Sequence, residues 1–172
     1  MEELVILVDA QDNPIGLMPK MEAHEKGVLH RAFSVFILND SNELMLQQRA
    51  LHKYHSPGLW TNTCCSHQRD GETNIAAGKR RLQEEMGFET DLHEITSFIY
   101  KAHFDNGLTE HELDHILLGQ YNAMPSINHD EVADWKWMPI EAVREDINQH
   151  PEKYTAWFII IFERFYEQIK TS

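Results

Sequence analysis

The feature that most constrains the fold is a run of nine residues, 30–38, that is largely apolar at both odd and even positions (HRAFSVFIL). Successive side chains of a strand point to opposite faces, so a strand of this kind needs apolar cover on both faces. The turn-forming residues Asp40, Ser41 and Asn42 then lead into a second apolar run, 44–48. The pattern predicts a hairpin in the middle of a sheet that is buried on both sides.

Two later segments have the pattern of helices that could cover this sheet. Residues 72–87 are rich in helix formers and end at Gly87, a residue type that commonly stops a helix. Their apolar side chains fall roughly on one stripe: Ile75, Leu82 and Met86. Pro139 and Pro151 each precede a periodic segment, which suits the first turn of a helix. The last segment, about 151–170, places four apolar residues on one face: Trp157, Ile161, Phe165 and Ile169.

Further strands are expected on either side of the helix at 72–87. Residues 4–8 have the pattern of a short buried strand, and turn formers follow at 12–16. A loop or short helix then carries Lys20 and His24, and the polar residues 49–58 are predicted to form an exposed loop. The strongest hairpin signal of the chain is Asp105-Asn106-Gly107, between two strand-like runs.

These elements predict an α/β (α+β) fold in which a mixed β-sheet is sandwiched between α-helices. The 172 residues are close to the roughly 150 typical of one domain, so a single domain spanning 1–172 is expected. The composition, 42% hydrophobic and 25% charged, is that of an ordinary globular domain.

The charge balance argues against several classes of partner. Fifteen lysine and arginine residues face 28 aspartate and glutamate residues, for a formal net charge of −13. Nucleic acids and anionic membranes attract basic surfaces, so neither is expected as a partner.

No apolar run approaches the roughly 18 residues of a membrane span, and the N-terminus is acidic where a signal peptide would be basic. The adjacent Cys64 and Cys65 are expected to be reduced thiols. We therefore expect a soluble, cytoplasmic protein.

Glu110 and Glu112 are predicted to share one face of a strand, because alternate side chains point the same way. Two carboxylates held that close repel, and a shared proton, a basic partner or a metal ion would offset the repulsion. A solvent-facing pair at a sheet edge would need none of these. His24, His30 and His67 come from three other segments, and imidazole together with carboxylate suits manganese, zinc or iron. The other histidines are expected to be surface or packing residues: His52, His55, His93, His103, His111, His115, His129 and His150.

The helix at 72–87 places Arg81 and Glu85 one turn apart on a common face. These two residues form either a solvent-facing ion pair or a functional pair, in which the carboxylate binds magnesium and the arginine binds a substrate phosphate. Bases of the type that bind phosphate are grouped around the same histidine and cysteine segments: Lys20, Arg49 and Lys53. Cys65 precedes His67 by two residues; its thiol is either tuned for proton transfer by bases and a metal or a small buried hydrophobe.

Eight segments occur in an order typical of one protein family. They are KMEAH (20–24), LHRAFS (29–34), QRALHK (48–53), PGLWTN (57–62), CSH (65–67), GETN (71–74), RRLQEEMG (80–87) and EHE (110–112). On these motifs the chain, from about residue 4 to residue 157, resembles the type I isopentenyl diphosphate isomerases of the Nudix superfamily. The resemblance implies a Nudix-like mixed sheet between helices.

The Nudix box itself is matched at most of its positions: Glu72, Arg80, Leu82, Glu84, Glu85 and Gly87. Ser66 stands where the box has a glycine, and Arg81 stands where it has its second acid. Loss of a carboxylate weakens the multi-metal activation of water that a pyrophosphohydrolase needs. The departures therefore favour the isomerase over its hydrolase relatives.

The resemblance implies reversible migration of a carbon–carbon double bond between isopentenyl diphosphate and dimethylallyl diphosphate. It implies that Cys65 and Glu112 are the two proton-transfer groups and that Tyr100 assists near the glutamate. Trp157 would place its indole against the developing cation and help exclude water; as a residue of the core it is equally well explained.

The resemblance also implies two divalent ions and a diphosphate subsite. The family's divalent site is matched by residues that would hold Mn²⁺ or Zn²⁺: His24, His30, His67, Glu110 and Glu112. Glu85 matches the ligand of a Mg²⁺ that also meets the diphosphate, and the backbone carbonyl of Cys65 is a further candidate ligand of that ion. The side chains that would hold the phosphates are Lys20, Arg49, Lys53 and Arg81.

Two other functions remain open at this level. One is a Nudix pyrophosphohydrolase of a nucleoside diphosphate derivative, and the other is a non-enzymatic metal-binding domain. Arg81 in the box and Cys65 near His67 argue against the first, and the grouped bases argue against the second. The sequence leaves open the oligomeric state and which of Cys65 and Glu112 gives the proton.

Overall fold

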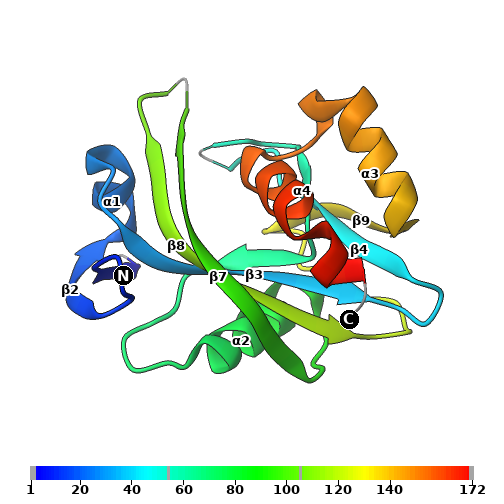
Figure 1. Cartoon of the computed structure of the whole chain (residues 1–172), viewed down its shortest axis with the longest axis horizontal. Coiled ribbons are helices and arrows are strands. Elements are labelled where there is room, and N and C mark those ends of the chain that lie inside the picture. Colours follow the sequence, from blue (N-terminus) through cyan, green and yellow to red (C-terminus); the bar gives the residue numbers. More distant parts are fainter. Residues whose placement is uncertain (1–2, 54, 105, 171–172) are drawn as a thin grey trace.

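A mixed β-sheet forms the centre of the chain, and helices pack on both of its sides (Figure 1). The computed structural model describes residues 3–53, 55–104 and 106–170. The expected mixed α/β sandwich is confirmed. None of the helices in the described part of the chain is long and apolar enough to cross a membrane.

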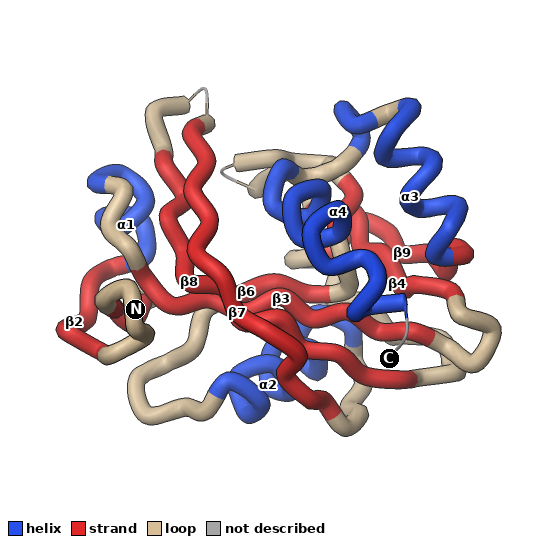
Figure 2. Tube along the Cα trace, in the orientation of Figure 1, coloured by secondary structure: helices blue, strands red, loops and turns tan. Residues whose placement is uncertain are grey.

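Groups of strands are separated by single helices along the chain, and the last helices follow the final strand (Figure 2). In chain order they are β1 (Leu4–Val8), β2 (Pro14–Pro19), α1 (Lys20–Lys26), β3 (His30–Leu38), β4 (Glu43–Arg49), β5 (Trp60–Thr61), β6 (Cys64–Ser66), α2 (Asn74–Met86), β7 (Leu92–His103), β8 (Thr109–Gln120), β9 (Val132–Pro139), α3 (Ile140–Gln149), the 3₁₀ turn η1 (Pro151–Lys153) and α4 (Ala156–Lys170).

Strand β3 is the central strand of the sheet and is buried on both faces, as its apolar run predicts. Phe33, Val35 and Ile37 pack in the cluster that includes α2. Phe36 and Leu38 pack in the cluster that includes α3 and α4. Because the two sets alternate along the strand, one nine-residue segment organises both layers of the core.

The pairing of β3 differs from the predicted hairpin. Strand β4 pairs with β3 only at Leu38 and Leu44, next to the turn, and beyond it pairs with β9. The remaining edge of β3 is taken by β6 and β1, while its other edge pairs in parallel with β8 from His30 opposite Glu112 onward. The hairpin prediction was therefore wrong beyond its turn, because other strands occupy both edges of β3.

The other predicted elements are present with shifted bounds. Pro14 begins β2, so the turn lies before it rather than at 12–16. Helix α2 begins at Asn74, is capped by the Thr73 side chain and ends at Gly87 with positive φ. The predicted last helix at 151–170 starts only at Ala156, after a 3₁₀ turn at Pro151.

The predicted apolar face of the last helix is partly correct. Trp157, Ile161 and Ile169 are buried, together with other aromatic residues of α4. Phe165 is only half-buried at the edge of the same core cluster, and its backbone (φ −116°, ψ 18°) departs from the helical conformation.

The β7–β8 pair forms the predicted long hairpin and reaches up beside α1 and α4 (Figure 1). Residue 105 of its predicted turn lies outside the described residues, and Gly107 has a positive φ of 82°. One end of the hairpin therefore lies between the segments that carry His24 and Trp157, where the site is built.

We expect Gly87→Ala to destabilise the protein by about 3 kcal/mol, with the strain of a left-handed backbone and a steric clash as its two causes. Gly87 has φ 72°, and an added Cβ would lie 2.3 Å from the carbonyl oxygen of Ser126. Gly71→Ala is the matched control, since φ is 86° there and no atom lies within 4 Å of the added Cβ; it should cost only about 1 kcal/mol. Urea unfolding measures both, and equal losses would contradict the clash.

Candidate active site and metal centre

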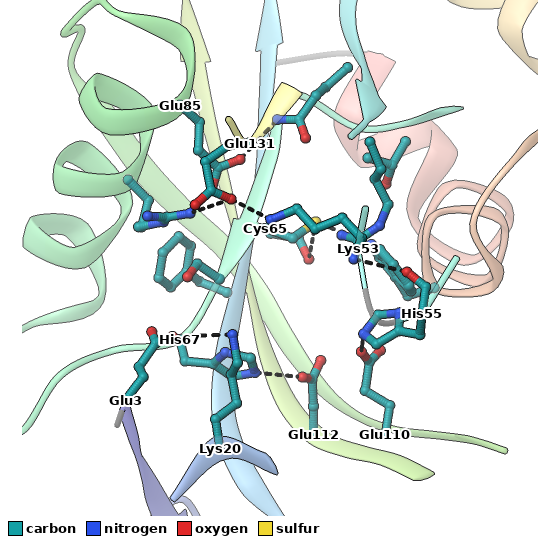
Figure 3. Close-up of a pocket in the computed structure, with 18 residues that line it drawn as sticks. Glu3, Lys20, Lys53, His55, Cys65, His67, Glu85, Glu110, Glu112 and Glu131 are labelled. Atoms are coloured by element: carbon teal, nitrogen blue, oxygen red, sulfur yellow. Dashed lines mark hydrogen bonds and ion pairs between the residues drawn. The ribbon is translucent and has the colours of Figure 1, made fainter. Parts of the chain in front are cut away.

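The site is built on one face of the sheet. Glu110 and Glu112 alternate along β8, so both carboxylates point to the same side, as expected. His30 lies opposite Glu112 in the β3–β8 pairing, and Cys65 lies opposite Ser34 in the β3–β6 pairing. Three neighbouring strands thus present two carboxylates, an imidazole and a thiol to one side, and Glu110, Glu112 and Cys65 line one pocket (Figure 3).

The predicted metal ligands come together beside this pocket, which His67, Glu110 and Glu112 line. One candidate ligand atom from each of His24, His30, His67 and Glu112 lies within 4.8 Å of the others, and all four residues are buried. The Glu112 Oε2 atom lies 3.3 Å from His30 Nε2 and 2.9 Å from His67 Nε2. Glu110 belongs to a second group that shares His24, with 3.8 Å between its Oε2 and His24 Nε2.

Backbone carbonyls fix which nitrogen of two histidines faces the centre. His24 Nδ1 lies 2.7 Å from the Lys20 carbonyl oxygen, and His30 Nδ1 lies 2.9 Å from that of Val28. A carbonyl oxygen only accepts, so Nδ1 carries the proton and donates it in both rings. The Nε2 atom of each ring is then directed toward the carboxylates, and a ring oriented in this way through its other nitrogen is the arrangement of a metal-ligating histidine. The donor set therefore fits a divalent cation.

His55, predicted to be a surface or packing residue in an exposed loop, is a buried packing residue and also belongs to this cluster. Its side chain is buried, its Nε2 lies 3.3 Å from Glu110 Oε2, and it forms a possible ligand group with His24 and Glu110. Its ring stacks on Phe104, with 4.8 Å between centroids, and meets Trp157 edge-on. The sequence signal that could have identified it is its place two residues after the predicted phosphate ligand Lys53.

Burial, mutual repulsion and the neighbouring histidines give the carboxylates of Glu110 and Glu112 different pKa values. Burial and the charge of Glu112 raise the pKa of Glu110 to about 7. Burial would also raise the pKa of Glu112, but hydrogen bonds from His30 and His67 outweigh burial and hold that pKa below its usual value. Burial lowers the pKa of His67 to about 4, so its ring is neutral near pH 7. A neutral ring is the form that binds a metal.

Cys65 lies in a pocket wall that keeps its thiol protonated. Burial and the charge of Asp114 raise the pKa of Cys65 to about 12. The thiol donates to Asn62 Oδ1 at 3.0 Å, and the Trp157 indole Nε1–H donates to the sulfur at 3.2 Å. Cys65 and Trp157, assigned from distant parts of the sequence, are thus in direct contact.

Tyr100 lies opposite Glu112 in the β7–β8 pairing and is buried on the same face. Burial and the charges of Glu110 and Glu112 raise its pKa above the usual value, so the hydroxyl stays protonated, and it has no hydrogen-bond partner among the described residues. Sequence reasoning missed Asp114, which continues the Glu110–Glu112 alternation and accepts a hydrogen bond of 2.8 Å from the Ser34 hydroxyl. The signal was available, because residues i, i+2 and i+4 of a strand share a face.

The four predicted phosphate-binding cations line the same pocket, which also contains Glu85: Lys20, Arg49, Lys53 and Arg81. Arg81 Nη2 donates to Glu85 Oε2 at 2.6 Å, as the one-turn spacing predicts. Gln47 donates to the other oxygen of Glu85 at 3.0 Å and so fixes this buried carboxylate. The Arg49 guanidinium lies 5.1 Å from the Trp157 ring centroid.

Two carboxylates that line this pocket were not identified from the sequence. Glu3 lies 3.1 Å from Lys20, and Glu131 contacts both Lys53 and Arg81 (Figure 3). Nothing in the local sequence around either residue sets it apart from the other acids of this acidic chain. Only the fold brings them to the cations.

Comparison with known proteins shows the family to which the chain belongs. The family model of the NUDIX domain matches residues 28–158. A protein of Serratia proteamaculans (strain 568) named isopentenyl-diphosphate Delta-isomerase is 48% identical over 163 residues, covering 95% of this chain and 91% of that protein. A Photorhabdus laumondii protein named isopentenyl-diphosphate Delta-isomerase 2 is 51% identical over 158 residues, covering 92% of this chain and 89% of that protein.

Solved structures with low sequence identity share the fold. A crystal structure from Deinococcus radiodurans has a TM-score of 0.71 at 18% identity and covers 86% of this chain and 90% of its own. The MutT protein of Methanosarcina mazei Go1 has a TM-score of 0.67 at 16% identity, with coverage of 81% and 94%.

Proposed function

Because the chain belongs to the isopentenyl-diphosphate Delta-isomerases, a family built on the NUDIX domain, we propose that it interconverts isopentenyl diphosphate and dimethylallyl diphosphate. The observation that carries the proposal is one pocket lined by the Cys65 thiol, the Glu110–Glu112 carboxylate pair and four cations. The cations suit a diphosphate, while the thiol and a carboxylate suit proton transfer at its hydrocarbon end.

The reaction needs one proton added and one removed. Addition of a proton to the terminal carbon of the double bond leaves a tertiary cation at the adjacent carbon, and loss of a proton from the next carbon forms the new double bond. We assign these transfers to Cys65 and Glu112. The raised pKa of Cys65 supports a thiol that starts each turnover protonated.

Trp157 and Tyr100 would assist at the reacting carbons. The Trp157 indole is buried against Cys65, so its ring face can stabilise the cation that forms there. Tyr100 is buried beside Glu112 and can hydrogen-bond it. Both side chains exclude water, which would otherwise capture the cation as an alcohol.

We assign a divalent ion, Mn²⁺ or Zn²⁺, to the ligands His24, His30, His67, Glu110 and Glu112. Such an ion offsets the repulsion of the two carboxylates and lowers the proton affinity of Glu112. A Mg²⁺ bound with the diphosphate is assigned to Glu85 and to the carbonyl of Cys65. The buried, doubly hydrogen-bonded carboxylate of Glu85 suits a hard cation.

Lys20, Arg49, Lys53 and Arg81 would anchor the diphosphate. This binding is remote from the reacting carbons and positions the five-carbon unit between Cys65 and Glu112. The partner is thus a small allylic or homoallylic diphosphate. We place the activity in the cytoplasm, where the free thiols of Cys64 and Cys65 remain reduced.

The test is to incubate purified protein with isopentenyl diphosphate and Mg²⁺ and to follow both dimethylallyl diphosphate and released phosphate. We expect isomerisation without phosphate release. Phosphate release from this substrate or from a nucleoside diphosphate derivative would favour a Nudix pyrophosphohydrolase. No turnover with intact metal binding would favour a non-enzymatic metal-binding domain.

A further inference from the structure

We propose that Glu131 is an internal counter-anion of the diphosphate subsite, whose carboxylate pairs with Lys53 and Arg81 and must leave them when a diphosphate binds. The inference rests on the proposed function, which assigns these two cations to the diphosphate. It adds a residue that sets how tightly the anion is held.

The contacts of Glu131 are those expected of an anion bound in this subsite. Its Oε2 atom pairs with Lys53 Nζ and also lies 3.5 Å from Arg81 Nη2. The same Arg81 nitrogen donates to Glu85 at 2.6 Å. Arg81 thus contacts three carboxylates, because its Nη1 also lies 3.1 Å from Glu84 Oε1, and Lys53 is paired with Glu131. A phosphate oxygen and the Glu131 oxygen would compete for the same donors.

The backbone around Glu131 is fixed independently of this ion pair. The segment before it binds the C-terminal carbonyls of α2, because the Ser126 N–H donates to Met86 and the Asn128 N–H donates to Glu85. The Glu131 carbonyl accepts from the Ala50 N–H at 3.3 Å, at the start of the segment that carries Lys53. Secondary structure and loop packing therefore hold Glu131 next to the cations even when its side chain turns away.

The side chain itself is free to turn, because 28% of its surface is exposed and, among the described residues, its only ion-pair partners are the two cations. Two consequences follow. Without ligand, Glu131 keeps Lys53 and Arg81 in place despite their mutual repulsion. With ligand, part of the favourable interaction with the diphosphate is offset by loss of this carboxylate, so affinity is lower than four cations alone would give.

The experiment measures binding of inorganic pyrophosphate by isothermal titration calorimetry to the full chain, with and without added Mg²⁺. Glu131→Gln keeps the size of the side chain and removes its charge. We expect Glu131→Gln to bind pyrophosphate about fivefold to tenfold tighter than the unchanged protein under both conditions, the size of one to two modest ion pairs. The KM for isopentenyl diphosphate should fall in parallel, with kcat changed less than KM.

Two further variants make the result specific. Asp130→Asn removes the same charge at an exposed neighbouring position and should change pyrophosphate affinity less than about twofold, because solvent screens it. Lys53→Met should weaken binding about tenfold. If Lys53→Met binds normally, the proposed diphosphate subsite fails. If Lys53→Met binds pyrophosphate weakly but the pyrophosphate affinity of Glu131→Gln is unchanged or lower, only the counter-anion inference is overturned. If Glu131→Gln binds pyrophosphate more weakly only when Mg²⁺ is present, Glu131 is instead a metal ligand.

Discussion

Cys65→Ala should lower kcat for isomerisation of isopentenyl diphosphate by about a thousandfold or more, because a positioned proton-transfer group typically contributes a factor of 10² to 10⁴. The alanine can neither give nor take a proton, and no other thiol lines the described pocket. The KM should change little, since the cations that would bind the diphosphate are untouched. The residual rate of the variant is measured from the conversion of isopentenyl diphosphate over long incubations with enzyme in excess.

Cys64→Ala is the matched control for this prediction. Cys64 is the adjacent residue of β6, and its fully buried side chain packs in the cluster that includes α2, on the other side of the sheet from the thiol of Cys65. Its loss should cost about 1 kcal/mol of stability through the cavity it leaves and should keep kcat within about threefold. A fully active Cys65→Ala variant would overturn the assignment of Cys65.

Glu112→Gln should have the second large effect, on both metal content and turnover. The amide cannot carry the charge that His30 and His67 approach at 3.3 and 2.9 Å, and it cannot exchange a proton. We expect metal affinity to fall at least about tenfold and kcat about a thousandfold. Metal analysis of the purified variant and a rate measured at saturating divalent ion separate the two losses.

Glu110→Gln is the matched control, since it makes the same change two residues earlier on the same face of β8. It should also bind metal weakly, because Glu110 belongs to the neighbouring ligand group. At saturating metal, however, its kcat should recover to within about tenfold of normal, whereas Glu112→Gln should not recover. Recovery of Glu112→Gln to the same extent would limit Glu112 to metal binding and exclude it as a proton-transfer group.

Local sequence patterns were sufficient to predict helices and strands and which of their residues share a face. Alternation placed Glu110 and Glu112 together, and a two-sided apolar run marked β3 as the central strand. The spacing of one helical turn paired Arg81 with Glu85. These inferences succeed because side-chain direction in a strand or helix follows from backbone geometry alone.

Long-range pairing was not available from the same patterns. The parallel match of β3 with β8 puts His30 directly opposite Glu112, whereas the sequence suggested β4 as the main partner of β3. Several strands with similar apolar character can pair in more than one order, so the choice depends on packing of the whole sheet. Local strand propensity therefore does not predict which strands pair with each other.

The sequence by itself thus determined the chemical inventory of the site: the imidazoles and carboxylates of a metal centre, a thiol, and four cations in an acidic chain. Only the tertiary structure decided that His55 is buried against Glu110 and that Glu131 pairs with Lys53 and Arg81. The reason is physical. A side chain's type fixes what it can bind, but its burial and its counter-ion are set by segments far away in sequence, here the end of α2 and the loop before β9.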